Sequence, residues 1–539
     1  MPPLDGREAG LAIIWPQRMN HIEAVIICLL VAVAVLSAVA TRIGVPYPIL
    51  LVLGGLGLGF VPGIPDVRLQ PDLVLVVFLP PLIYSGAFFA NLRELRADMR
   101  TITLLSTLLV ITTAAAVAVT AHALVAGLPW AVCFALGAIV APTDPVAATT
   151  IARRFDIPRR TINILEGESL INDASALVLY KVAVGAMAGG AFSLLDAGTR
   201  FVGAAAGGVA VGLVVAVVLR EIRRRLDDPP VEVTISLLSG YAAYVPADAI
   251  GASGVVAAVT AGIALGWWAP EITTPLVRQQ LFSLWSSLSF LLNAILFVLI
   301  GLQLPTILDA LSGRSLGFLL GTAAAVSAVV AATRIAWVLV TPYIVRAIDR
   351  RRSQRARRAG WRTRMVLAWS GMRGSVSLAA ALALPESTPE RELVVFITFA
   401  VILSTLVLQG LTLPAVIRGL GVHDDGAEAQ EELRARLVAT HAALARIEEL
   451  GAEEWTRDDT IERMTGVYDY RRRRLKARAG KIDDDGYEDR SQSYQRLVRE
   501  VLEAQRAAVV ALRNDGTISN DVMHRIEREL DLEDQRLEI

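Results

Sequence analysis

Three acids and an amide lie close together in an apolar stretch, residues 160–188. They are Glu166, Glu168, Asn172 and Asp173. The stretch is long enough to cross a bilayer, where a carboxylate near the centre costs at least ~2.5 kcal/mol. Ionisable groups in such places usually belong to an ion path or a proton relay. We therefore interpret Asp173 as a carrier group for a proton or a small monovalent cation. Asn172 beside it cannot titrate, which leaves one switching charge.

Further oxygen ligands are expected at the same depth. Ser169 lies one helical turn before Asp173, so the two side chains share a face. Thr143 and Asp144 lie at a similar depth in the preceding span. Asp173, Asp144, Ser169 and Thr143 would together offer only hard oxygen ligands, which suit Na⁺ better than Zn²⁺ or Cu⁺. Because burial disfavours the charged form of a carboxylate, H⁺ and Na⁺ would compete for Asp173.

A second buried anion, Glu168, needs a positive partner. Arg334, in the middle of segment 315–347, is the first candidate and Arg373 the second. Breaking a buried pair costs ~3–5 kcal/mol, so we interpret Glu168 as structural. Asp144 and Arg373 are expected to balance the dipole ends of interrupted helices.

The composition places these residues in a membrane protein. The chain has 539 residues, of which 54% are hydrophobic, and apolar runs of about twenty residues recur along it. Lys+Arg and Asp+Glu balance at 52 each, so net charge indicates no nucleic-acid partner. The two cysteines lie in apolar runs and suggest neither a disulfide framework nor a metal site. We predict an all-α polytopic fold with about thirteen spanning segments. Their approximate bounds are 22–41, 45–60, 72–90, 101–126, 129–152, 160–188, 197–220, 231–249, 253–268, 283–302, 315–347, 364–384 and 392–418.

Two of these segments contain helix breakers and a charge in mid-membrane. Residues 141–145 hold two prolines and an acid, and residues 370–375 hold two glycines and an arginine. Each lies in the middle of a three-helix set, roughly 101–188 and 315–418. Two broken helices in matching positions are typical of an inverted repeat, with a transport site near the bilayer midplane.

Charge in the loops predicts the orientation. Arginines concentrate in alternate loops, most of all between residues 346 and 364. We expect the protein to lie in the plasma membrane. The positive-inside rule then places segment 1–21 outside the cell and the C-terminus in the cytoplasm. Both Met1 and Met19 fit as start sites. The transmembrane domain would cover 22–420. Residues 421–539 are charged, with apolar residues at helical spacing, and predict a soluble cytoplasmic helical tail whose regulatory role or ligand stays open.

Four motifs carry a resemblance to a known family. They are Phe-Leu-Pro-Pro-Leu at 78–82, Ala-Pro-Thr-Asp-Pro-Val at 141–146, Gly-Glu-Ser-Leu-Ile-Asn-Asp at 167–173 and Gly-Met-Arg-Gly at 371–374. Over about residues 20–420 the chain resembles the electroneutral monovalent cation/proton antiporters, that is, NhaP-like bacterial proteins and animal Na⁺/H⁺ exchangers.

The resemblance implies an architecture. It implies a homodimer in the lipid membrane, with scaffold helices at about 22–90 and 197–302 forming the dimer. The core helices, at about 101–188 and 315–418, would move like an elevator.

The resemblance also implies roles for the site residues. Asp173 would bind both the ion and the proton. Glu168 and Arg334 would form the core ion pair of the family. Four other residues would shape or coordinate the site: Thr143, Asp144, Ser169 and Asn172.

We therefore expect a sodium/proton antiporter that exchanges one cation for one proton and serves pH homeostasis. A K⁺/H⁺ antiporter on the same scaffold is an alternative, and a gated cation channel is an alternative from another class. No nucleophile–base pair or metal motif favours an enzyme. We expect no cofactor beyond the transported Na⁺ and H⁺.

Overall fold

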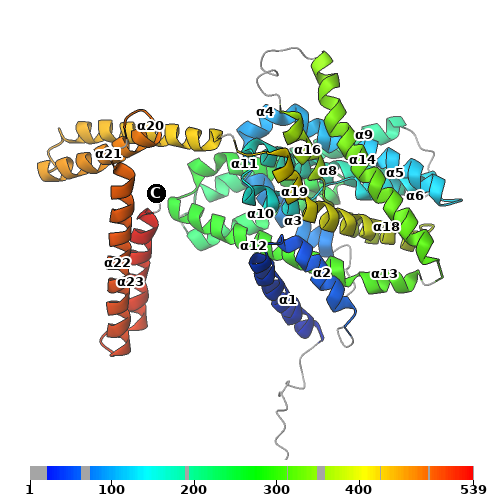
Figure 1. Ribbon diagram of the computed structural model, residues 1–539, viewed down its shortest axis with the longest axis horizontal. Coiled ribbons are helices and arrows are strands. Elements are labelled where there is room, and N and C mark those ends of the chain that lie inside the picture. The colour runs from blue at the N-terminus through cyan, green and yellow to red at the C-terminus, as the bar shows by residue number, and fades with distance from the viewer. Residues whose placement is uncertain are drawn as a thin grey trace, which may run out of the picture. The chain divides into compact units, whose positions relative to one another are not determined.

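The structure, a computed structural model, describes residues 21–61, 73–187, 194–226, 228–311, 313–348, 359–424, 426–483 and 486–537 (Figure 1). The chain divides into two compact units, Met1–Asp424 and Asp425–Ile539, and each is described by itself. Most of the predicted N-terminal segment 1–21, including both start candidates, lies outside the described residues. The same holds for most of the basic stretch between residues 346 and 364.

Every element described in the first unit is helical, and three short π-helical turns are labelled η. In chain order the elements are α1 (His21–Ile43), α2 (Tyr47–Gly59), η1 (Leu73–Phe78), α3 (Leu79–Phe88), α4 (Leu92–Thr103), η2 (Leu104–Leu108), α5 (Leu109–Leu124), α6 (Trp130–Val140), α7 (Pro145–Arg154), α8 (Arg159–Met187), α9 (Leu194–Arg223), α10 (Pro229–Ala249), α11 (Gly254–Ile272), α12 (Pro275–Leu302), α13 (Leu304–Ala310), α14 (Leu316–Ile348), α16 (Trp361–Trp369), α17 (Ser375–Leu382), α18 (Arg391–Ser404), η3 (Thr405–Gln409) and α19 (Gly410–Leu420).

The predicted polytopic all-α fold is confirmed. In the described part of the chain, nine helical stretches are long and apolar enough to cross a membrane. The shorter apolar helices α2 and α3, together with α10 and the interrupted pair α16–α17, bring the segments to the expected number of about thirteen. The short helix α13 was not predicted.

Some predicted boundaries were wrong. Helix α4 begins at Leu92, not near residue 101, and α12 begins at Pro275, not near residue 283. In both cases the helix begins with residues that are more polar than the apolar span that follows them. The Asn91 side chain caps α4 by accepting from two backbone N–H groups, and the Thr274 side chain caps α12. Hydropathy alone does not register such polar extensions.

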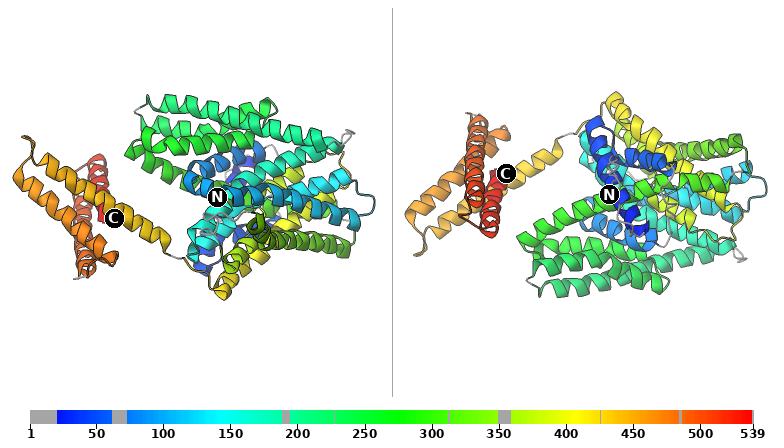
Figure 2. Two further views of the ribbon diagram at one scale, coloured as in Figure 1. Left: turned by 90° about the horizontal axis from the view of Figure 1, so that it is seen from above. Right: turned by 90° about the horizontal axis from the view of Figure 1, so that it is seen from below.

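Two hydrophobic clusters divide the first unit. One joins α5–α8 to α14 and α16–α19 and includes parts of α2 and α12. The other joins α3 to α9, α10, α11 and α12. Helix α1 lies at the surface, and Val33 and Ala40 are its buried residues among those described (dark blue in Figure 2).

Small residues allow the closest helix contacts. Helices α2 and α12 pack against each other, and a Cβ at Gly55 would overlap the Val298 carbonyl oxygen. A Cβ at Gly301 would overlap the Val52 carbonyl oxygen in the same way. Close backbone approach through small residues is a common way to pack helices where lipid removes the hydrophobic driving force.

The second unit consists of four helices: α20 (Ala427–Leu450), α21 (Asp458–Arg478), α22 (Tyr487–Asn514) and α23 (Asn520–Leu537). α20 packs on α21, α21 on α22, and α22 on α23. Leu437, Leu475, Leu502 and Leu530 are among the few buried apolar side chains. The predicted helical tail is therefore present as a charged assembly of helices.

Candidate ion-binding site

Two interrupted helices meet at the centre of the first unit. Helix α6 ends at Val140 and α7 begins at Pro145, while α16 ends at Trp369 and α17 begins at Ser375. The backbone N–H of Asp144, in the first break, donates to the carbonyl oxygen of Met372, in the second, at 2.8 Å. The two breaks are thus joined directly, and each supplies a partner for a backbone group that the other leaves free.

Glycine is required where the breaks touch their neighbours. A Cβ at Gly374 would overlap the Asp144 carboxylate, and a Cβ at Gly371 would overlap the Arg334 side chain. The two glycines of the motif therefore permit close packing around both charged side chains.

Asp144 and Arg373 lie at the helix breaks. The Asp144 carboxylate caps α7 by accepting from the Val146 N–H at 2.9 Å, where a negative charge favours the helix dipole. The Arg373 side chain is buried, and its backbone N–H donates to Thr405 Oγ1 at 3.0 Å. Among the described residues, its Nε and Nη1 have no hydrogen-bond partner.

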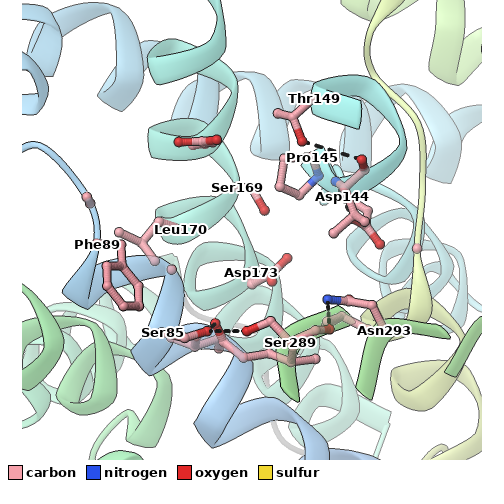
Figure 3. Close-up of a pocket in the computed structure, with 18 of the residues that line it drawn as sticks. Ser85, Phe89, Asp144, Pro145, Thr149, Ser169, Leu170, Asp173, Ser289 and Asn293 are labelled. Atoms are coloured by element: carbon pink, nitrogen blue, oxygen red, sulfur yellow. Dashed lines mark hydrogen bonds between the residues drawn. The ribbon is translucent and has the colours of Figure 1, made fainter. Parts of the chain in front are cut away.

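Asp173 and Ser169 project from one face of α8 into a cavity of about 460 Å³ (Figure 3). Asp144 faces the same cavity from the first break, and Thr143 also lines it. Asp173 lies fourteen residues from the start of α8 at Arg159, about 21 Å along the helix. Four of the predicted site residues are thus gathered around one hollow.

Glu168 points away from this cavity into a buried network. Both its carboxylate oxygens accept from Arg334, at 2.5 and 2.9 Å, and both side chains are about 1% exposed. Arg334 also donates to the carbonyl oxygens of Leu367 and Ala368, each at 3.2 Å. Of the two arginines considered as partners for Glu168, Arg334 makes the contact. It ties α8, α14 and α16 together.

Thr143 and Asn172 connect this network to the first break. The Thr143 hydroxyl donates to Glu168 at 3.1 Å and accepts from the Asn172 amide at 2.8 Å. Asn172 is 1% exposed and is not among the residues that line the cavity. Its geometry suits positioning of Thr143 rather than contact with an ion.

The opposite wall of the cavity holds polar residues that the sequence analysis did not single out. Ser85 on α3 shares a hydrogen bond of 3.1 Å with Ser289 on α12 (Figure 3). The Asn293 amide donates to the Ser289 carbonyl oxygen at 2.8 Å. Ser289 and Asn293 are four residues apart and share a helix face. That spacing inside an apolar span was the available signal.

An exposed ion pair lies at one end of the cavity. Arg153 at the end of α7 contacts Glu166 on α8 at 2.9 Å, with side-chain exposures of 69% and 41%. Both residues line the cavity, which therefore reaches from Asp173 to solvent-accessible groups two turns nearer the start of α8.

The side chains that line the cavity offer mainly oxygen donors. In the described ranges, no cluster of three or more His, Cys, Asp or Glu side chains could hold a metal ion. Asp144, Asp173, Thr143 and Ser169 supply carboxylate and hydroxyl oxygens, the type of ligand that hard cations prefer.

Crossed helix breaks beside a carboxylate-lined cavity, in a polytopic helical unit, define an ion-coupled membrane transporter. The particular family follows from residues 27–419, which match the family described as "Sodium/hydrogen exchanger, transmembrane". The chain belongs to this family. The resemblance carried by the four sequence motifs is confirmed, and the protein is a multi-pass cation/proton antiporter whose substrates are the transported ions; it is not an enzyme.

Relatives match along most of the chain. An uncharacterised Na⁺/H⁺ exchanger of Mycobacterium tuberculosis is 37% identical over 523 residues, covering 95% of this chain and 96% of the relative. The low-affinity Na⁺/H⁺ antiporter NhaS1 of Synechocystis is 34% identical and covers 75% of each chain. The sodium, potassium, lithium and rubidium/H⁺ antiporter of Bacillus subtilis is 31% identical, covering 72% of this chain and 60% of the relative.

A solved structure shares the fold. The sodium proton antiporter MjNhaP1 of Methanocaldococcus jannaschii aligns with a TM-score of 0.58 and 22% identity, covering 74% of this chain and 99% of that one.

Proposed function

We propose that the protein is an electroneutral Na⁺/H⁺ antiporter in which one cation and one proton compete for Asp173. One observation carries the proposal. Two anions lie close together on α8, and Glu168 is neutralised by Arg334 while Asp173 faces the cavity. Within the described residues, the Asp173 side chain makes no salt bridge. An acid without a cationic partner in such a place is the group that a proton or a cation would neutralise.

Competition at one carboxylate yields exchange. Asp173 loaded with H⁺ or Na⁺ is neutral and can cross the membrane with its helices, whereas the empty carboxylate is charged and costly to move. Each cycle then carries one positive charge in each direction. Asp144, Ser169 and Thr143 would complete the Na⁺ shell, and Asn172 would hold Thr143 in place.

We propose elevator-type movement because the cavity lies between two groups of helices. Its walls come from α7, α8 and α17 on one side and from α3 and α12 on the other. Sliding of the first group, part of core 101–188 and 315–418, would carry Asp173 past Ser289 and Asn293. Scaffold helices 22–90 and 197–302 would stay in place and form the homodimer.

The proposed orientation has the N-terminus outside a plasma membrane and the tail 421–539 inside. Under this orientation the Arg153–Glu166 end of the cavity would face the cytoplasm, and we infer that the site opens inward in this arrangement. Glu166 would then attract cations toward Asp173.

Transport in proteoliposomes tests the function. Proton release driven by Na⁺, K⁺ and Li⁺ would be recorded by a pH dye, with and without an imposed membrane potential. The proposal expects Na⁺-driven exchange whose rate does not respond to the potential. A rate that follows the potential would contradict one-for-one exchange, and ion currents without proton movement would indicate a channel.

A K⁺/H⁺ antiporter is the second candidate, and one observation favours it. The relative from Bacillus subtilis is a sodium, potassium, lithium and rubidium/H⁺ antiporter. Comparable exchange with K⁺ and Na⁺ in the same assay would extend the substrate range, and exchange with K⁺ alone would replace the Na⁺ proposal.

A further inference from the structure

A second cavity, of about 150 Å³, lies among α4, α8, α14 and α16, apart from the ion-binding site. Its volume is roughly ten times what one water molecule needs. Among the described residues, three arginines line it, one each from α4, α8 and α16, together with one carboxylate, Asp98. They are Arg100, Arg160 and Arg364. Arg160 holds Asp98 through hydrogen bonds of 2.9 Å from Nε and 2.5 Å from Nη2. In the described part of the lining, positive charge therefore exceeds negative charge, and Asp98 is already paired with Arg160.

Two buried donors at this cavity lack a partner. Arg364 is only 6% exposed and donates from Nη1 to the Leu339 carbonyl oxygen at 3.2 Å. Among the described residues, its Nε and the indole Nε1 of Trp337 have no hydrogen-bond partner. Buried N–H groups are rarely left unsatisfied, so each one indicates something that accepts from it. Both residues line the same hollow, from α16 and α14.

Apart from Thr101 and Thr341, the remaining described wall residues are mainly apolar. Leu104, Leu105, Val338 and Pro342 belong to stretches long and apolar enough to cross a membrane. A ligand that fits must carry an acceptor-rich anionic group at one end and hydrocarbon at the other. Guanidinium groups recognise phosphate oxygens well, and an indole N–H adds a neutral donor.

We propose that this cavity binds the phosphate group of an anionic membrane phospholipid. The phosphate would accept from Arg364 Nε and Trp337 Nε1, with Arg100 and Arg160 adding positive charge. The glycerol and upper acyl carbons would lie along Leu104 and Val338. Such a lipid would join α8, which carries Asp173, to α16, which leads into the second helix break.

The test uses the full-length protein in detergent, titrated with phosphatidylglycerol, with phosphatidylcholine or with inorganic phosphate. The midpoint of thermal unfolding and the lipids retained in native mass spectrometry are the readouts. The variants are Arg364→Gln and Trp337→Phe, and the latter keeps an aromatic ring while removing the N–H. The control is Arg96→Gln, an exposed arginine on α4 that is absent from the cavity lining.

Phosphatidylglycerol is expected to raise the unfolding midpoint of the unaltered protein and to be retained. Arg364→Gln should weaken the apparent affinity for phosphatidylglycerol at least ~5-fold, as expected for the loss of one basic residue at an anionic lipid. Trp337→Phe should weaken it by ~2–10-fold through loss of one hydrogen bond. Arg96→Gln should change it less than about twofold, since an exposed charge contributes little. If Arg364→Gln fails to fold, Trp337→Phe against the control decides.

Three results would overturn the proposal. Equal weakening by the control would show diffuse attraction to the surface rather than a site. An equal effect of phosphatidylcholine would remove the requirement for an anionic lipid. An equal effect of millimolar inorganic phosphate, weakened by the same variants, would assign the cavity to a free anion.

Discussion

The Glu168–Arg334 pair gives the sharpest prediction for stability. Glu168→Gln keeps the shape of the side chain and its contact with the Thr143 hydroxyl but removes its charge. Arg334 is 1% exposed, so its guanidinium would be left buried without a counter-ion. Breaking a buried pair in this way costs ~3–5 kcal/mol.

The expected shift in melting temperature follows from the size of the unit. Unfolding entropy is ~2.1 cal/mol/K per residue, which over roughly 400 residues converts 1 kcal/mol into about 1.2 °C. The loss of ~3–5 kcal/mol should therefore lower the melting temperature of the transmembrane unit by roughly 4–6 °C. Thermal unfolding in detergent, followed by size-exclusion chromatography of the protein that survives heating, measures this shift.

Glu166→Gln is the matched control, because it removes a carboxylate two residues away on the same helix. Its pair with Arg153 is exposed, at 69% and 41%, and such pairs contribute ~0–1 kcal/mol. The double variant Glu168→Gln/Arg334→Met leaves no buried charge unpaired and should melt no lower than Glu168→Gln alone. If Glu168→Gln melts within a degree of the control, the pair does not stabilise the unit as reasoned.

Two further predictions concern the helix crossing and the tail. Gly374→Ala should lower transport and thermal stability, because the new Cβ would overlap the Asp144 carboxylate. The control Gly360→Ala should change neither, because there is open space around Gly360. Equal effects of the two substitutions would contradict the close contact at Gly374. In the tail, hydrogen bonds from Arg478 hold the pKa of Glu488 below its usual value, so this contact stabilises α21 against α22 above about pH 4.3 and is lost as pH falls. Hydrogen-exchange protection of α21 and α22, corrected for the intrinsic rate, should therefore fall between about pH 5 and about pH 3. Glu488→Gln should abolish the difference, and unchanged protection in the unaltered protein would refute the prediction.

The sequence predicted most of the fold because the physics of a bilayer is simple. Apolar runs of about twenty residues have few alternatives to a spanning helix. The errors lie where that argument ends. The first residues of α4 are polar and amphipathic, and their helix depends on the Asn91 cap and on packing rather than on hydropathy. The short helix α13 has no such signal either.

The candidate site was predictable in part. Acids and helix breakers in mid-membrane pointed to Asp173 and Asp144, since only a cavity or a partner justifies them. Ser289 and Asn293 were not predicted, because an uncharged polar side chain in a spanning helix costs less free energy than a charged one and is therefore a weaker sign of a site. The separation of Asn172 from the cavity could not be foreseen, because adjacent residues on a helix point about 100° apart and only the packing of Thr143 shows which face is occupied.

We propose that Asp173 is the single group that carries both ions. Asp173→Asn, purified and reconstituted beside Asp248→Asn, tests it most directly; Asp248 is an exposed carboxylate paired with Lys181 at 3.2 Å. We expect Na⁺-driven proton release to fall to the level of empty liposomes in Asp173→Asn, while this variant elutes as a folded protein and Asp248→Asn transports like the unaltered chain. Exchange at the normal rate in folded Asp173→Asn would show that Asp173 is not the carrier group.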